Sequence, residues 1–176
     1  MQLADALTLI REIPNFPEPG IRFQDITPLL ANAEAFASVT EEFSQLVVRG
    51  TQVAGIEARG FIFASALAQR IGSGFVPIRK AGKLPYQSIS QSNGLEYGSS
   101  TLEIHIDAIN SRDEAVILVD DVLATGGTVR AAIDLIHQCG GKVVDVLVLL
   151  EIDSLLGRQM ISEVFPDVRI TSLVTV

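Results

Sequence analysis

The sequence predicts a doubly wound α/β fold in which helices cover both faces of a mainly parallel sheet. Apolar-rich stretches of strand length predict four strands, at residues 53–58, 75–80, 116–119 and 143–152, and residues 116–119 form a continuous apolar run typical of a buried strand. Helical apolar patterns at residues 61–71 and 129–139 separate these strands in pairs, as in βαβ units. A length of 176 residues suits a single domain spanning residues 1–176.

The N-terminal part is expected to contain two helices with an irregular segment between them. In residues 1–11 the apolar side chains recur at helical spacing, at Leu3, Ala6, Leu7 and Ile10. Residues 32–50 show the same pattern over a longer stretch. Residues 15–28 are too rich in proline for a central strand or helix, and too rich in Phe and Ile for a solvated linker. This segment must therefore pack against other residues.

The remaining segments are assigned from their polarity. Residues 86–93 are polar and lack an apolar stripe, which is typical of a mobile flap. Residues 102–106 alternate between apolar and polar side chains, which predicts a half-exposed strand. Residues 168–176 are expected to close the sheet as an edge strand. The predicted flap covers residues 84–102.

Composition excludes several classes of protein. The net charge is −8, which argues against nonspecific nucleic-acid binding, because such binding needs Lys and Arg to neutralise phosphates. No apolar run reaches the roughly 18 residues of a membrane span, and the N-terminus lacks the pattern of a signal peptide. Cys139 is the only cysteine, so no disulfide is expected. These observations favour a cytoplasmic protein without nucleic-acid or membrane partners.

Two carboxylates and a glycine-containing loop follow the apolar run 116–119. Asp120 and Asp121 should face a ligand, because open α/β sheets bind ligands outside the carboxyl ends of their strands. Residues 124–128 add two glycines, whose backbone N–H groups can converge on an anion, and two threonine hydroxyls. Thr128 is expected to be the N-cap of the next helix, whose dipole favours a phosphate. Carboxylates for sugar hydroxyls beside a phosphate cradle indicate a site for a phosphorylated ribose.

The run Val-Asp-Asp-Val-Leu-Ala-Thr-Gly-Gly-Thr at residues 119–128 resembles the ribose-phosphate signature of type I phosphoribosyltransferases, which bind 5-phosphoribosyl 1-diphosphate (PRPP). A Walker phosphate loop is excluded, because no Lys follows the glycines and their spacing differs. The resemblance implies that family's fold and ribose binding by Asp120 and Asp121. It also implies a site for the 5-phosphate of PRPP or AMP at Ala124, Thr125, Gly126, Gly127 and Thr128.

The run Glu-Ala-Arg-Gly-Phe at residues 57–61 resembles the diphosphate-binding turn of the same family. Arg59 can donate a forked pair of hydrogen bonds to diphosphate oxygens. In relatives this turn contains a non-proline cis peptide, a rare bond that here would join Glu57 to Ala58. The resemblance therefore implies diphosphate binding at Arg59.

A cluster of cations ends the strand at residues 75–80. Arg-Lys-Ala-Gly-Lys-Leu-Pro at residues 79–85 resembles a pattern of the adenine-specific members of the family. On that resemblance Arg79, Lys80 and Lys83 bind the departing diphosphate. Arg79 would also reach the active site of a neighbouring subunit, which implies a homodimer.

Residues 1–35 resemble the N-terminal hood of adenine phosphoribosyltransferases, which lies over the base. The resemblance implies adenine contacts from Ile21, Phe23 and Leu123, with the Phe23 ring stacking on adenine. One departure concerns Gln24, which stands where the family usually has Arg. A base contact or a tether of the hood is therefore expected to differ here.

Leu-Glu-Tyr-Gly at residues 95–98 resembles the catalytic lid of the family and lies within the predicted flap. Closure of such a lid excludes water from an intermediate that water would otherwise capture. On the resemblance Glu96 is the catalytic residue and exchanges a proton with the imidazole ring of adenine.

These resemblances cover nearly the whole chain and imply purine salvage, in which adenine and PRPP give AMP and diphosphate. The implied cofactor is Mg²⁺, bound through diphosphate and ribose oxygens with its waters near Asp120 and Asp121. Two alternatives stay open. One is a sister transferase that uses xanthine or hypoxanthine and guanine, and the other is a non-catalytic PRPP-sensing regulator. The regulator would need a nucleic-acid surface, which a net charge of −8 disfavours.

Overall fold

The computed structural model describes residues 1–92, 101–109, 111 and 114–176. The chain forms two compact units, Met1–Leu46 and Val47–Val176, which are described separately below. The expectation of one domain with a hood at residues 1–35 stays a prediction.

The first unit contains three helices and a hairpin. The sequence analysis did not predict the hairpin. Its elements are α1 (Leu3–Leu7), β1 (Arg11–Pro14), β2 (Arg22–Asp25), α2 (Thr27–Ala31) and α3 (Ala33–Gln45). Strands β1 and β2 pair antiparallel, with Arg11 opposite Asp25. Each strand of a two-stranded hairpin has a free edge, so a proline such as Pro14 removes no ladder hydrogen bond that the strand needs. The proline-rich composition therefore concealed a hairpin.

The second unit is built on a seven-stranded sheet among its described residues, with strand order β5-β6-β4-β3-β7-β8-β9. Its strands are β3 (Gln52–Ile56), β4 (Phe75–Lys80), β5 (Ser88–Ser92), β6 (Thr101–His105), β7 (Ala115–Leu123), β8 (Lys142–Glu151) and β9 (Arg169–Thr175). The neighbouring strands in the part β4-β3-β7-β8-β9 are parallel. Strand β6 is antiparallel to β4, and β5 is antiparallel to β6. A mainly parallel sheet, closed at one edge by residues 169–175, is confirmed.

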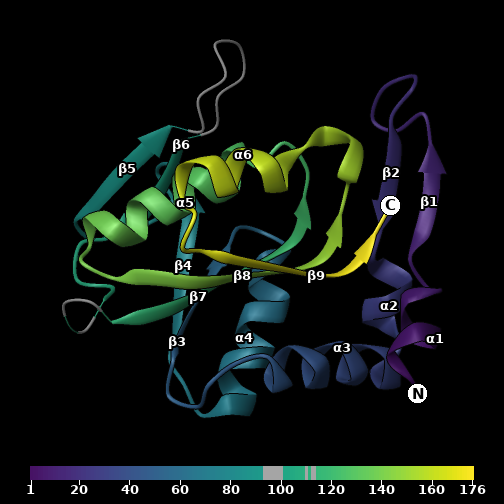
Figure 1. The fold of residues 1–176 in the computed structure, drawn as a ribbon, viewed down its shortest axis with the longest axis horizontal. Coiled ribbons are helices and arrows are strands. Elements are labelled where there is room, and N and C mark those ends of the chain that lie inside the picture. Colours follow the sequence, from purple (N-terminus) through teal and green to yellow (C-terminus); the bar gives the residue numbers. More distant parts are fainter. Residues whose placement is uncertain (93–100, 110, 112–113) are drawn as a thin grey trace. The chain divides into compact units, whose positions relative to one another are not determined.

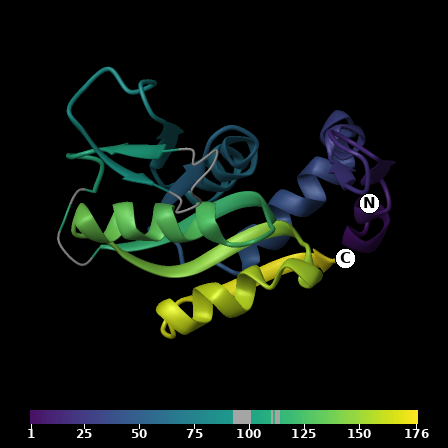
Figure 2. The same cartoon turned by 90° about the horizontal axis from the view of Figure 1, so that it is seen from above.

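Helices cover both faces of this sheet, as Figures 1 and 2 show. The helices are α4 (Gly60–Ile71), α5 (Gly127–Gln138) and α6 (Gly157–Val164), and a short 3₁₀ turn spans Asp153–Leu155. In Figure 1, α5 and α6 lie above the sheet and α4 lies below it. Strands β3, β7 and β8 are almost wholly buried between these layers, which explains their continuous apolar runs. The predicted doubly wound α/β fold is confirmed. Among the residues described, no helix is both long and apolar enough to cross a bilayer.

Strand β5 occupies part of the segment that the sequence analysis assigned to the flap. It pairs antiparallel with β6 along its whole length, from Ser88 opposite His105 to Ser92 opposite Thr101. An edge strand obtains its hydrogen bonds from its neighbour, so it forms without an apolar stripe of its own. Residues 93–100 of the predicted flap, including Glu96, lie outside the described residues, and the catalytic role of Glu96 stays a prediction.

Candidate functional site

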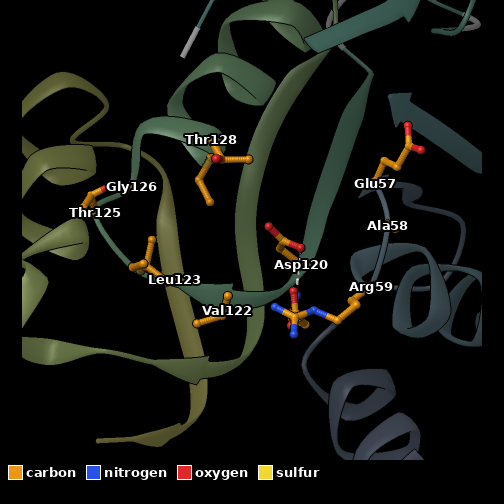
Figure 3. Close-up of a pocket in the computed structure, with 12 residues that line it drawn as sticks. Glu57, Ala58, Arg59, Asp120, Val122, Leu123, Thr125, Gly126 and Thr128 are labelled. Carbon is orange, nitrogen blue, oxygen red and sulfur yellow. Dashed lines mark hydrogen bonds and ion pairs between the residues drawn. The ribbon is translucent and has the colours of Figure 1, made fainter. Parts of the chain in front are cut away.

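A cavity of about 320 Å³ lies at the carboxyl ends of β3 and β7, within the second unit. Its walls come from two segments (Figure 3), the turn after β3 and the end of β7 with the loop that leads into α5. The lining residues are Glu57, Ala58, Arg59, Asp120, Asp121, Val122, Leu123, Ala124, Thr125, Gly126, Thr128 and Val129. The parallel strand order makes β3 and β7 neighbours, so the two motifs meet at one edge of the sheet.

Asp120 and Asp121 form a buried acid pair near the end of β7, with 8% and 5% of their surfaces exposed. The Asp121 N–H donates a hydrogen bond of 2.9 Å to Asp120 Oδ1. Burial and the neighbouring Asp121 charge raise the pKa of Asp120 well above its ordinary value. Such a pair holds negative charge at a cost, and hydroxyl donors or a cation at this position would lower that cost.

The start of α4 packs directly against Asp120, and Gly60 makes this approach possible. A Cβ at Gly60 would lie 2.7 Å from Asp120 Oδ1 and 2.9 Å from the Val119 carbonyl oxygen. A side chain at this position would therefore push α4 away from β7. The glycine of the Arg-Gly pair thus brings the helix N-terminus, with its partial positive charge, to the acid pair.

Figure 3 shows the Arg59 side chain extended from the turn after β3 toward the end of β7. It forms an ion pair with the second acid, Asp121. Its Nε atom lies 2.7 Å from Asp121 Oδ2. Burial raises the pKa of Asp121, and the Arg59 guanidinium opposes this shift. The peptide bond between Glu57 and Ala58, two residues before Gly60, is cis, so this sequence prediction is confirmed.

The second predicted group of cations, Arg79, Lys80 and Lys83, does not line the cavity in the part of the chain that is described. Arg79 Nε lies 3.2 Å from Glu57 Oε2, and the Lys80 N–H donates to the same oxygen at 2.9 Å. Burial alone would raise the pKa of Glu57, but the Lys80 N–H and the Arg79 guanidinium lower it below its ordinary value. Arg79 thus lies behind the cis turn, while the Lys80 and Lys83 side chains are exposed.

Residues 124–128, the phosphate loop, line the cavity with all their members except Gly127. Gly126 has a φ of +85° and is the N-cap of α5, which begins at Gly127. The expectation that Thr128 is the N-cap is therefore wrong, because the left-handed glycine ends the loop two residues earlier. Thr128 lies in the first turn, where backbone N–H groups have no acceptor within the helix. This geometry keeps the N–H groups available to an anion.

The predicted adenine contacts come from both units of the chain. Leu123 lines the cavity and is 1% exposed. Phe23 lies in β2, where its ring packs edge-on against Phe16 with centroids 5.2 Å apart. Ile21 precedes the same strand and is 44% exposed. Contact of Ile21 and Phe23 with adenine stays a prediction.

The sequence analysis did not assign to the site one group of residues that lies beside the phosphate loop. Gly157 begins α6, and the next residue, Arg158, forms an ion pair with Glu151 at the end of β8. No local pattern in the sequence links these residues, because the contact joins separate elements. The only local signal is a Gly-Arg pair at the start of an amphipathic helix.

A sheet with this topology, carrying an acid pair and a glycine phosphate loop at one edge, defines the phosphoribosyltransferase class. The family model "Phosphoribosyl transferase domain" matches residues 28–172. An adenine phosphoribosyltransferase from Thermobifida fusca is 49% identical over 170 residues, which are 95% of this chain and 93% of the relative. The chain belongs to the adenine phosphoribosyltransferase family.

Solved structures agree with this assignment. The crystal structure of adenine phosphoribosyltransferase from Thermoanaerobacter pseudethanolicus matches with a TM-score of 0.91 and 44% identity, covering 99% of this chain and 100% of that one. The enzyme from Saccharomyces cerevisiae, crystallised with adenine and an imino-altritol bisphosphate, matches with a TM-score of 0.89 and 34% identity. That match covers 98% of both chains.

Proposed function

We propose that this protein transfers the 5-phosphoribosyl group of PRPP to adenine and releases AMP and diphosphate, the purine salvage reaction of its family. The observation that carries the proposal is the meeting of the acid pair, the cis turn and the phosphate loop around one cavity. This set of groups offers acceptors for ribose hydroxyls and donors for a phosphate within one cavity of about 320 Å³.

The phosphate loop would hold the 5-phosphate as a fixed anchor. Its donors are the N–H groups of the loop and of the first turn of α5, together with the hydroxyls of Thr125 and Thr128. Binding energy from this non-reacting phosphate would position the anomeric carbon relative to adenine and the leaving group.

The acid pair and the cis turn would act on the other end of the ribose. Asp120 and Asp121 can accept hydrogen bonds from the ribose hydroxyls. Arg59 supplies a planar guanidinium beside them, and positive charge here would stabilise the negative charge that grows on the departing diphosphate. Arg79 would add to this field from behind Glu57, and Lys80 and Lys83 would supply mobile ammonium groups.

The acid pair also fits Mg²⁺ binding through water. Mg²⁺ commonly keeps several waters and takes few protein carboxylates. Burial and, after it, the neighbouring Asp121 charge raise the pKa of Asp120, and a cation nearby would favour its ionised form. Among the described residues no group of three or more His, Cys, Asp and Glu side chains could hold a metal alone, so substrate oxygens would complete the ligand set. When bound, Mg²⁺ would supply charge neutralisation of the diphosphate.

Base recognition and proton transfer would be completed by groups outside this cavity wall. The buried Leu123 would contribute to the apolar wall near the adenine ring, and we infer that Ile21 and Phe23 contact the ring. Glu96 would exchange a proton with the imidazole ring of adenine as its nitrogen attacks the anomeric carbon.

We infer in addition a homodimer in the cytoplasm. The dimer is supported by the resemblance at Arg79, and the location by the free thiol of Cys139, which suits a reducing compartment.

A substrate panel tests the proposed function. Adenine, hypoxanthine, guanine and xanthine would each be incubated with PRPP and Mg²⁺, and nucleotide formation followed by chromatography. We expect AMP from adenine and at most traces from the other bases. If IMP, GMP or XMP were the main product, the protein would be a sister transferase that uses another purine base. PRPP binding without any nucleotide formation, together with a DNA gel shift, would favour a regulator.

A further inference from the structure

The start of α6 lies directly against the phosphate loop. A Cβ at Gly157 would lie 2.2 Å from the Ala124 carbonyl oxygen and 3.0 Å from the Gly126 nitrogen. Conversely, a Cβ at Gly126 would lie 2.9 Å from the Gly157 carbonyl oxygen. Neither glycine has room for a side chain, so the two main chains are in direct contact. The position of the phosphate loop therefore depends on where α6 begins.

Arg158 ties the start of α6 to the end of β8. Its Nε donates to Glu151 Oε1 at 2.8 Å, and its Nη2 donates to the other carboxylate oxygen. This two-pronged pair has the fixed geometry of a guanidinium on a carboxylate. Glu151 is the last residue of β8, and its side chain is 5% exposed.

The same guanidinium also bonds to β9. Its Nη1 donates to the Ile170 carbonyl oxygen at 2.7 Å, and its Nη2 lies 3.1 Å from Ser172 Oγ. Ser172 Oγ donates in turn to Glu151 Oε2 at 2.8 Å. The Arg158 side-chain hydrogen bond and the Ser172 hydroxyl outweigh burial and lower the pKa of Glu151, so the carboxylate stays charged. Arg158 is thus fixed by three separate groups on two strands.

We propose that Arg158 is a positioning residue for phosphate binding. Its bonds to Glu151 and β9 set the start of α6, and Gly157 transmits that position to the Ala124 carbonyl and the Gly126 amide. The inference rests on the proposed function, because it assumes that the phosphate loop binds the 5-phosphate. A loop displaced by about 1 Å would aim its N–H groups away from the phosphate, and misplacement of that size weakens function by up to roughly a hundredfold.

The test compares two ligands that differ only in the phosphate. AMP and adenosine would be titrated into the wild-type protein and into R158M, R158K and G157A, with calorimetry giving each Kd. We expect the AMP Kd to rise by roughly tenfold or more in R158M and G157A, while the adenosine Kd stays within about twofold. R158K should recover part of the AMP affinity, because Lys keeps the charge but makes fewer of the hydrogen bonds.

A matched control comes from the same pair of strands. Arg169 in β9 donates to the buried Asp145 of β8 at 2.5 Å, near the opposite end of these strands. R169M should lower the Tm, as R158M does, but leave the ratio of AMP to adenosine affinity unchanged. If G157A does not fold, R158M and R158K still decide the question. Kinetics should show a raised KM for PRPP with kcat and the KM for adenine close to wild type.

Two results would overturn the inference while leaving the proposed function intact. One is an AMP Kd in R158M equal to that of the wild type, and the other is an equal loss of AMP and adenosine affinity. A wild-type protein that binds AMP no more tightly than adenosine would overturn the assignment of the phosphate loop itself, and this inference with it.

Discussion

The guanidinium of Arg59 lies against the carboxylate of Asp121, with Nε 2.7 Å from Oδ2. The resemblance assigned Arg59 to diphosphate and Asp121 to ribose, yet the structure pairs them with each other. Burial raises the pKa of Asp121, and Arg59 opposes that shift, so the arginine helps to keep the acid ionised. Binding of PRPP should rearrange or extend this pair, because both partners are predicted to bind the substrate.

Replacing Arg59 should therefore affect both affinity and pH dependence. R59M removes the cation but keeps much of the apolar stem. We expect the KM for PRPP to rise by roughly tenfold to a hundredfold, the loss typical of a hydrogen bond to a charged group. The pKa of Asp121 should rise without its partner, so the acidic limb of the kcat/KM profile for PRPP should move to higher pH. An unmoved limb would show that Arg59 does not control the ionisation of Asp121.

Asp120 is predicted to serve function at the expense of stability. D120N keeps an oxygen that can accept the Asp121 N–H bond but removes a buried charge. We expect D120N to raise the free energy of unfolding by on the order of 1 kcal/mol at pH 8 and to weaken PRPP binding.

The pH dependence of D120N follows from the sign of the pKa shift. A raised folded-state pKa means that the ionised form destabilises the native state above that pKa. The advantage of D120N should therefore shrink as the pH falls through the raised pKa, and disappear near the ordinary value of 3.8. Urea unfolding at several pH values measures this. A gain that does not change with pH would contradict the electrostatic explanation.

Glu57 should show the opposite behaviour. Its folded-state pKa is lowered, so its ionised form stabilises the protein above the ordinary value of 4.5, and this contribution is lost as the pH falls. E57Q should lower the free energy of unfolding by about 1 kcal/mol at pH 7, because Arg79 and the Lys80 N–H lose a charged acceptor. The difference from wild type should vanish in acid. A deficit that persists at pH values well below the lowered folded-state pKa of Glu57 would indicate a packing defect instead.

Gly60 can be tested against a matched glycine. G60A adds a Cβ 2.7 Å from Asp120 Oδ1, so α4 or the acid pair must shift. We expect a loss of roughly 1–3 kcal/mol in stability, the usual range for overpacking, together with weaker PRPP binding. G74A is the control, because a Cβ at Gly74 meets no atom within 4 Å. Equal Tm values for both variants would show that α4 can move away from β7 without penalty.

Glu96 is tested by kinetics. E96Q keeps the size of the side chain but cannot act as an acid or base. We expect kcat to fall by roughly 10²-fold, the lower range for general acid-base catalysis, with only a modest change in PRPP affinity. D134N, at a half-buried position of α5, is a control for loss of one negative charge. An unchanged kcat in E96Q would remove Glu96 from the chemistry.

Much of the fold could be predicted because the signals were local. Strands β7 and β8 are buried on both faces, so they need apolar side chains at successive positions. Such runs can be recognised in the sequence. Hairpin β1–β2 and strand β5 escaped prediction because their hydrogen bonds depend on a partner strand. The N-cap of α5 was placed two residues late because a glycine at positive φ, not a threonine side chain, ends the loop.

The sequence by itself determined the buried strands and the helices between them, the acid pair and the phosphate loop, because periodicity and glycine spacing are encoded within short segments. Only the tertiary structure decided the pairing of the charges. Arg59 lies on Asp121, Arg79 on Glu57 and Arg158 on Glu151 because the parallel strands bring separate loops to one edge. A charged residue in the sequence does not specify its partner, since the Coulomb energy depends on distance in space and on burial.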